Sequence, residues 1–85
     1  MMRVRYVSHI PRDVRKLASY QGDGYTLTIF RNGSAYYALL DVGNELYNLA
    51  MKVHAEGPEK ALSIFFAELG FLPIKKNEGG DINEL

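Results

Sequence analysis

Cysteine is absent from this 85-residue chain, and other markers of particular protein classes are scarce. Without thiols the chain forms neither disulfides nor thiolate metal sites. A disulfide-free domain of this size fits a reducing compartment, so we expect a cytoplasmic protein. No apolar run approaches the roughly 18 residues of a membrane span, and no membrane association is expected. Charged and apolar residues alternate at the N-terminus, which argues against a signal peptide.

Groups that support catalysis or bind metals are also few. His9 and His54 are the only histidines, and they stand too far apart for a local metal-ligand spacing. No serine stands in a G-x-S-x-G nucleophile motif, and Gly22-Asp23-Gly24 lacks the lysine and serine of a phosphate-binding loop. We therefore expect a protein that is not an enzyme, with no catalytic residue, no cofactor and no metal site.

The length and composition predict one small globular domain. With 47% apolar and 24% charged residues, the chain is too hydrophobic for a disordered protein. The domain is expected over residues 1–74, followed by a flexible polar tail over residues 75–85 that lacks apolar periodicity. A core this small predicts a free energy of unfolding of roughly 5 kcal/mol, and such marginal stability favours a homo-oligomer, most simply a dimer.

A β-hairpin is the clearest local signal. Residues 25–30 and 35–42 are rich in β-branched and aromatic side chains, and Asn32-Gly33 between them favours a type I′ turn. With these two as loop residues, Ile29 pairs with Tyr36. One face of the hairpin then carries the predicted core, which consists of Tyr25, Leu27, Ile29, Tyr36, Ala38 and Leu40.

One strand and one helix are predicted before the hairpin. Apolar and polar residues alternate over residues 3–10, which is the pattern of a half-buried strand. Pro11 as a first helical residue and Asp13 in the first turn predict a helix over residues 11–20, which is closed by Gly22.

Two helices are predicted after the hairpin, separated by Gly57-Pro58. The first begins at Asn44 as its N-cap, and the second runs from Pro58 to Gly70. The expected fold class is therefore α+β: an antiparallel three-stranded sheet, built in the order strand, helix, hairpin, and packed on two C-terminal helices.

The second face of the hairpin is the predicted protein interface. Six tyrosines and four phenylalanines exceed what one small core readily absorbs, and tyrosine combines a large apolar area with a hydrogen-bonding tip. The predicted interface residues are Thr28, Phe30, Tyr37 and Leu39. The leading hypothesis is a protein-binding or self-associating module, a phage-type or cellular regulator or inhibitor that occupies a partner's site.

Basic residues near the N-terminus support an alternative function. Residues 1–16 hold five basic residues and one acid, whereas residues 41–85 hold eight acids and four lysines. Nucleic-acid binding would use Arg3, Arg5, Arg12, Arg15 and Lys16. A single patch of these residues in the structure would favour that function, and ion pairs with the acidic half would favour a solvated surface.

A family resemblance rests on Leu27-Thr28-Ile29-Phe30-Arg31-Asn32-Gly33, Tyr36, Val42 and Leu46-Tyr47-Asn48-Leu49. In these residues the chain resembles the KTSC domain, a small hairpin-then-helix module sometimes appended to lysyl-tRNA synthetases. The resemblance covers roughly residues 27–57. The chain departs from it by one extra residue before Val42 and by Gly43 in place of a proline. The resemblance implies a role beside nucleic-acid enzymes and provides no catalytic residue.

Overall fold

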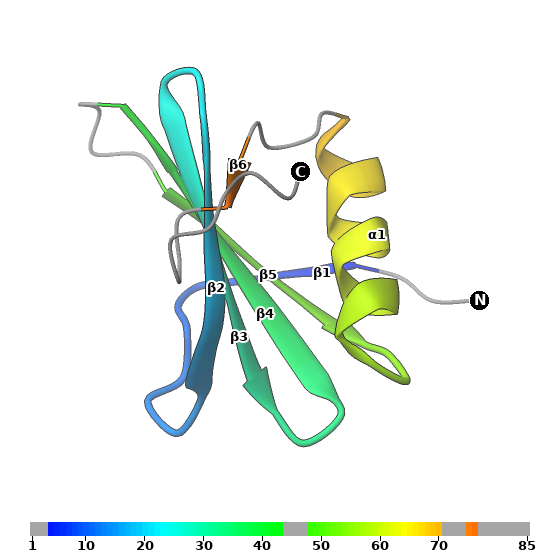
Figure 1. The fold of residues 1–85 in the computed structure, drawn as a ribbon. Coiled ribbons are helices and arrows are strands. Elements are labelled where there is room, and N and C mark those ends of the chain that lie inside the picture. Colours follow the sequence, from blue (N-terminus) through cyan, green and yellow to red (C-terminus); the bar gives the residue numbers. More distant parts are fainter. Residues whose placement is uncertain (1–3, 44–47, 71–74, 77–85) are drawn as a thin grey trace.

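The computed structural model describes residues 4–43, 48–70 and 75–76, which form an antiparallel sheet and one helix. The elements in chain order are β1 (Arg5–Val7), β2 (Arg15–Gly22), β3 (Tyr25–Asn32), β4 (Ala35–Val42), β5 (Asn48–His54), α1 (Pro58–Leu69) and β6 (Lys75–Lys76). The strand order in the sheet is β1-β5-β4-β3-β2-β6. Helix α1 lies on one face of this sheet (Figure 1). Most of the described residues belong to strands, so the fold is mostly β.

The prediction of a three-stranded sheet on two C-terminal helices is wrong, because the first of these helices is replaced by β5. Within β5, Leu49, Met51 and Val53 alternate with Ala50, Lys52 and His54, and Met51 and Val53 are fully buried. Leucine, alanine, methionine and lysine also favour helices, so local propensity does not decide between the two structures. Pairing with β4 on one side and β1 on the other makes this segment a strand.

The helix predicted over residues 11–20 is also wrong, because β2 occupies most of that segment. A β-bulge between Lys16 and Ala18 breaks the pairing with β3 and hides the period-2 alternation. Beyond the bulge, Ala18 and Tyr20 face α1 while Ser19 lies on the other face. The strand predicted within residues 3–10 is confirmed at β1, which pairs with β5 rather than with the hairpin.

The predicted hairpin is confirmed as β3 and β4, but its register differs by two residues. Asn32 pairs with Ala35, and Ile29 pairs with Ala38, so the loop residues are Gly33 and Ser34. Only Gly33 has a positive φ there, of 67°, which suits a type II′ turn and not the predicted type I′. A shift of two leaves every side chain on its predicted face.

Helix α1 confirms the predicted second C-terminal helix and closes the core. It begins at Pro58 and ends before Gly70, whose φ is 78° and whose N–H donates to the Phe66 carbonyl at 2.9 Å. Ala61 and Phe65 are fully buried against the predicted hairpin face. No helix in the described part of the chain is long and apolar enough to cross a membrane.

The connection between β1 and β2 crosses the sheet on the face away from α1 (Figure 1). It consists of residues 8–14 and must pass over one face of the sheet, because β5, β4 and β3 lie between the two strands that it joins. At its far end, Asn32 Nδ2 donates to Asp13 Oδ2 at 3.1 Å, which ties the connection to the β3–β4 hairpin. The second face of the hairpin is therefore partly covered by the chain itself.

The predicted tail begins with β6, in which Lys75 pairs with Gln21 and Lys76 with Tyr20. Residues 77–85, the remainder of that tail, lie outside the described residues.

Candidate binding surfaces

An apolar groove lies between β2 and α1, with a volume of about 230 Å³. The lining side chains are almost all apolar, and we call the feature the β2–α1 groove: Leu17, Ala18, Tyr20, Ile29, Pro58 and Leu62. The groove exists because α1 packs mainly over β4 and β5 and leaves the β2 side of the same sheet face less covered.

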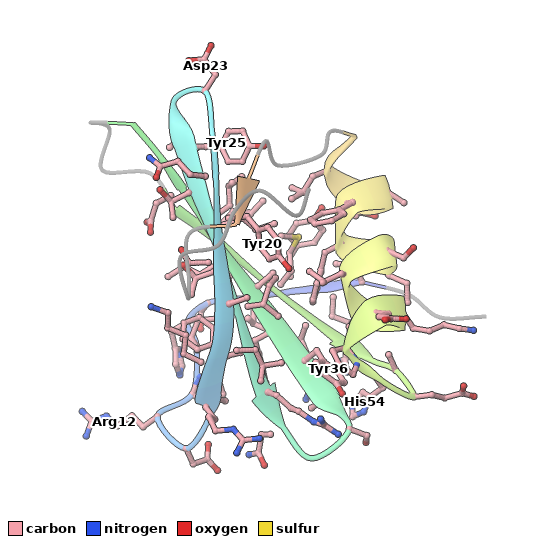
Figure 2. The ribbon with its side chains drawn as sticks, viewed as in Figure 1. Arg12, Tyr20, Asp23, Tyr25, Tyr36 and His54 are labelled. Atoms are coloured by element: carbon pink, nitrogen blue, oxygen red, sulfur yellow. The ribbon has the colours of Figure 1, made fainter. Side chains whose placement is uncertain are left out.

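Tyr20 forms the wall of the groove that bridges the sheet and the helix. Its ring contacts Phe66 edge to face, with 5.9 Å between ring centroids. Burial raises the pKa of the Tyr20 hydroxyl above its ordinary value. Figure 2 shows Tyr20 between β2 and α1, so its ring connects the strand to the helix at one side of the groove.

Part of the outer edge of β2, beside the groove, is paired with no strand that the structure describes. Strand β6 pairs only with Tyr20 and Gln21, and no described strand lies outside Leu17, Ala18 and Ser19. The β-bulge falls in this same stretch. Unpaired backbone N–H and C=O groups at a sheet edge are able to pair with an added strand.

The four predicted interface residues lie on the sheet face away from α1, as expected from their alternation. Tyr37 is only 7% exposed, and Lys52 Nζ lies 5.6 Å from its ring centroid, so Tyr37 offers little area to a partner. Thr28, Phe30 and Leu39 are half-buried. Their part in a protein interface stays a prediction.

The predicted nucleic-acid-binding residues do not form one surface. Arg3 lies outside the described residues, and Arg5 is exposed on β1 at the far side of the sheet. Arg12 precedes β2 at the end of the molecule opposite Asp23 (Figure 2). Arg15 lies on the α1 side of β2, whereas Lys16 lies on the other side, opposite Phe30.

Arg31 joins Arg12 and Arg15 at this end of the sheet, and sequence reasoning missed it. It lies directly across from Arg15 in the β2–β3 pairing. Its Nε donates to the Gly33 carbonyl at 2.8 Å, and its guanidinium carbon lies 5.0 Å from the centroid of the buried Tyr36 ring. Arg12 lies in the connection on the face away from α1, whereas Arg15 and Arg31 lie on the α1 side of the sheet. We call these three residues, which share one end of the sheet but not one face, the arginine cluster.

A polar hollow of about 260 Å³ lies at the opposite end of the sheet. Asp41 and Tyr25 are among its lining residues, and Asp23 projects from the adjacent β2–β3 turn (Figure 2). Burial raises the pKa of the Tyr25 hydroxyl. Among the described residues, no three histidine, aspartate or glutamate side chains come together to hold a metal ion.

The groove and the arginine cluster depend on pairings that one sequence does not reveal. Leu17 and Leu62 are 45 residues apart and fall on two separate predicted helices, so no local pattern indicates that they line one groove. For Arg31 the sequence does contain a signal: it directly precedes the Asn-Gly turn, where the hairpin places it at a sheet end.

Comparison with known proteins finds no match to this chain among protein-family models, curated proteins or solved structures. The resemblance of residues 27–57 to the KTSC domain stays a prediction, and the function is argued from the surfaces alone.

Proposed function

We propose that this chain is a protein-binding module that takes up an extended segment of a partner protein along the outer edge of β2. The observation that carries the proposal is the edge at Leu17, Ala18 and Ser19, which pairs with no described strand and lies directly beside the β2–α1 groove. Strand addition draws affinity from backbone hydrogen bonds and specificity from pockets for alternate side chains. Here the edge supplies the first and the groove the second.

The size of the groove supports a side chain as its occupant. Sites for small molecules and cofactors usually enclose about 300 to 1,000 Å³. At about 230 Å³ the groove is smaller, and apolar atoms dominate its lining. One or two apolar side chains of an extended segment fit this space and would be removed from water on binding.

Charge favours a foreign segment over a second copy of the chain. Antiparallel pairing of two β2 edges would place the Arg15 and Lys16 side chains of both copies in one short interface. Like charges at such separations repel, whereas acidic residues in a partner segment would be attracted. A module that occupies an edge-binding segment of another protein would act as a regulator or inhibitor, and this remains the leading hypothesis.

Selection from a displayed library of random 12-residue peptides tests the proposal and needs no named partner. The immobilised full chain should enrich peptides with apolar residues at alternate positions. Leu62→Ala, which removes area from the groove, should weaken their binding about tenfold. Leu69→Ala is the matched control, because Leu69 is half-buried on the same helix but does not line the groove.

Two outcomes would contradict the proposal. In the first, no peptide is enriched. In the second, the enriched peptides bind the Leu62→Ala and Leu69→Ala variants equally well. Light scattering on the same preparations measures the predicted dimer, and a dimer lost with Leu62→Ala would identify a second copy as the occupant.

A further inference from the structure

We propose that the arginine cluster binds the phosphate backbone of nucleic acid without reading its sequence. The proposal does not rest on the β2–α1 groove, because it concerns the end of the sheet where β2 begins and β3 ends. It differs from the function expected of the N-terminal segment, since Arg31 belongs to the site and Arg5 does not.

The first supporting observation is an opposition of like charges. Arg15 and Arg31 are direct cross-strand neighbours on one face of the sheet. Like charges in this position are destabilising. No carboxylate among the described residues bonds to Arg12, Arg15 or Arg31. A phosphate bound between Arg15 and Arg31 would turn this repulsion into two favourable interactions.

The second observation is the fixed position of Arg31. Its Nε donates to the Gly33 carbonyl, and its guanidinium plane lies over Tyr36, which is fully buried. The two terminal Nη groups donate to no described residue. An arginine held by its Nε and by a ring loses less side-chain entropy when a phosphate binds, and it still presents two nitrogens to that phosphate.

The third observation is the arrangement of acidic residues. Asp13, the nearest acid in sequence to Arg12, accepts a hydrogen bond from the neutral amide of Asn32, so it keeps its negative charge and offsets part of the positive charge at this end. Asp23 lies at the opposite end of the molecule (Figure 2). Glu56 follows β5, which β4 and β3 separate from β2. Arg31 on β3 is two strand spacings from β5, roughly 10 Å, and Arg15 on β2 is three, roughly 14 Å. The Debye length at physiological salt is about 8 Å, so Glu56 compensates Arg31 in part and Arg15 weakly.

The absence of a stacking platform sets the kind of recognition. Tyr6 is the one large hydrophobic side chain that is exposed among the described residues, and β1 places it away from the cluster. Sequence-tolerant binding of single strands usually adds aromatic stacking to backbone contacts. The cluster offers backbone contacts only, so we expect duplexes of different sequence to bind equally well.

Fluorescence anisotropy with the full chain and labelled oligonucleotides measures the number of phosphate contacts. Three contacts predict a slope of log affinity against log salt near −2.7 for duplex DNA and near −2.1 for single strands. Replacing both Arg12 and Arg15 by glutamine should reduce the duplex slope by about 1.8. Arg5→Gln is the matched control, because Arg5 is equally exposed but lies on β1, and it should leave the slope unchanged.

Three results would overturn the proposal: duplex binding weaker than about 100 μM at low salt, an unchanged slope in the double variant, or equal affinity for polyglutamate. The last result would assign the cluster to acidic protein segments. A separate measurement tests the premise without any ligand. If Arg15 and Arg31 repel one another, Arg15→Gln should raise the urea midpoint of unfolding. A lowered midpoint would show that the two arginines do not repel one another. Neither the anisotropy measurement nor the urea measurement uses the peptides selected against the groove, so both test the arginine cluster independently of the proposed function.

Discussion

Replacing Tyr36 by phenylalanine should stabilise the protein. Tyr36 is fully buried in the core beneath α1, and its hydroxyl oxygen has no hydrogen-bond partner among the described residues. A buried hydroxyl left without a partner costs the desolvation free energy of that group, about 1 to 3 kcal/mol. Phenylalanine keeps the ring and removes the unsatisfied group.

Two further terms reduce this gain without reversing it. Loss of one oxygen leaves a void smaller than a methyl group, and such a void costs less than about 1 kcal/mol. Arg31 remains over an aromatic ring, since its guanidinium carbon lies 5.0 Å from the Tyr36 centroid and phenylalanine also attracts a cation. The net expectation is a gain of roughly 1 kcal/mol in the free energy of unfolding.

Thermal and urea unfolding followed by circular dichroism measure this gain. For a domain of this size, 1 kcal/mol corresponds to a rise of about 4 to 8 °C in Tm. Tyr6→Phe is the control, because it should change the free energy of unfolding in the opposite direction. The Tyr6 side chain is 54% exposed and its hydroxyl donates to Glu68, so its loss should lower stability by about 0.5 kcal/mol. A Tyr36→Phe protein less stable than the parent would refute the reasoning, because the hydroxyl would then have a partner in solution.

Three other perturbations follow from the same structure. Burial raises the pKa of Tyr20 and Tyr25 above 10.0, so stability is fully present below pH 10 and is lost as pH rises through the raised pKa. Urea titrations across this range should show a shallower loss for Tyr20→Phe. A Cβ at Gly22 would overlap the Tyr25 ring, so Gly22→Ala should cost about 1 kcal/mol, and an unchanged urea midpoint would show that the ring moves freely. Truncation of the fully buried Phe65 to alanine should cost about 3 to 5 kcal/mol and leave the far-ultraviolet circular dichroism of a largely unfolded chain at 37 °C.

The parts of the fold that the sequence predicts correctly are those that local chemistry determines. Proline at the start and glycine at the end define α1, and the alternation around Asn32-Gly33 defines the β3–β4 hairpin. The register of the hairpin is not determined in the same way. The predicted type I′ turn at Asn32-Gly33 needs positive φ at both residues, whereas the observed turn at Gly33-Ser34 needs it at Gly33 alone, so Gly33 suits either turn.

The parts predicted wrongly depend on partners distant in the sequence. Segment 48–54 contains residues that suit a helix or a strand, and its pairing with β1 and β4 decides between them. In β2, the bulge after Lys16 removes the alternation by which a strand is recognised. Strand β2 also supplies one side of the groove and Arg15 of the cluster, so neither surface was predictable without the sheet topology.

The crossing connection between β1 and β2 also has a consequence for folding kinetics. Strands β2 to β5 are neighbours in the order of the chain, so short loops close their pairings rapidly. Strand β1 pairs Arg5 with Lys52 and must close a far longer loop, at a greater cost in chain entropy. We therefore expect β1 to join after the rate-limiting barrier. Destabilising substitutions in β1 should then leave the folding rate nearly unchanged and accelerate unfolding. The stability of the β1–β5 pairing therefore contributes to the lifetime of the folded state.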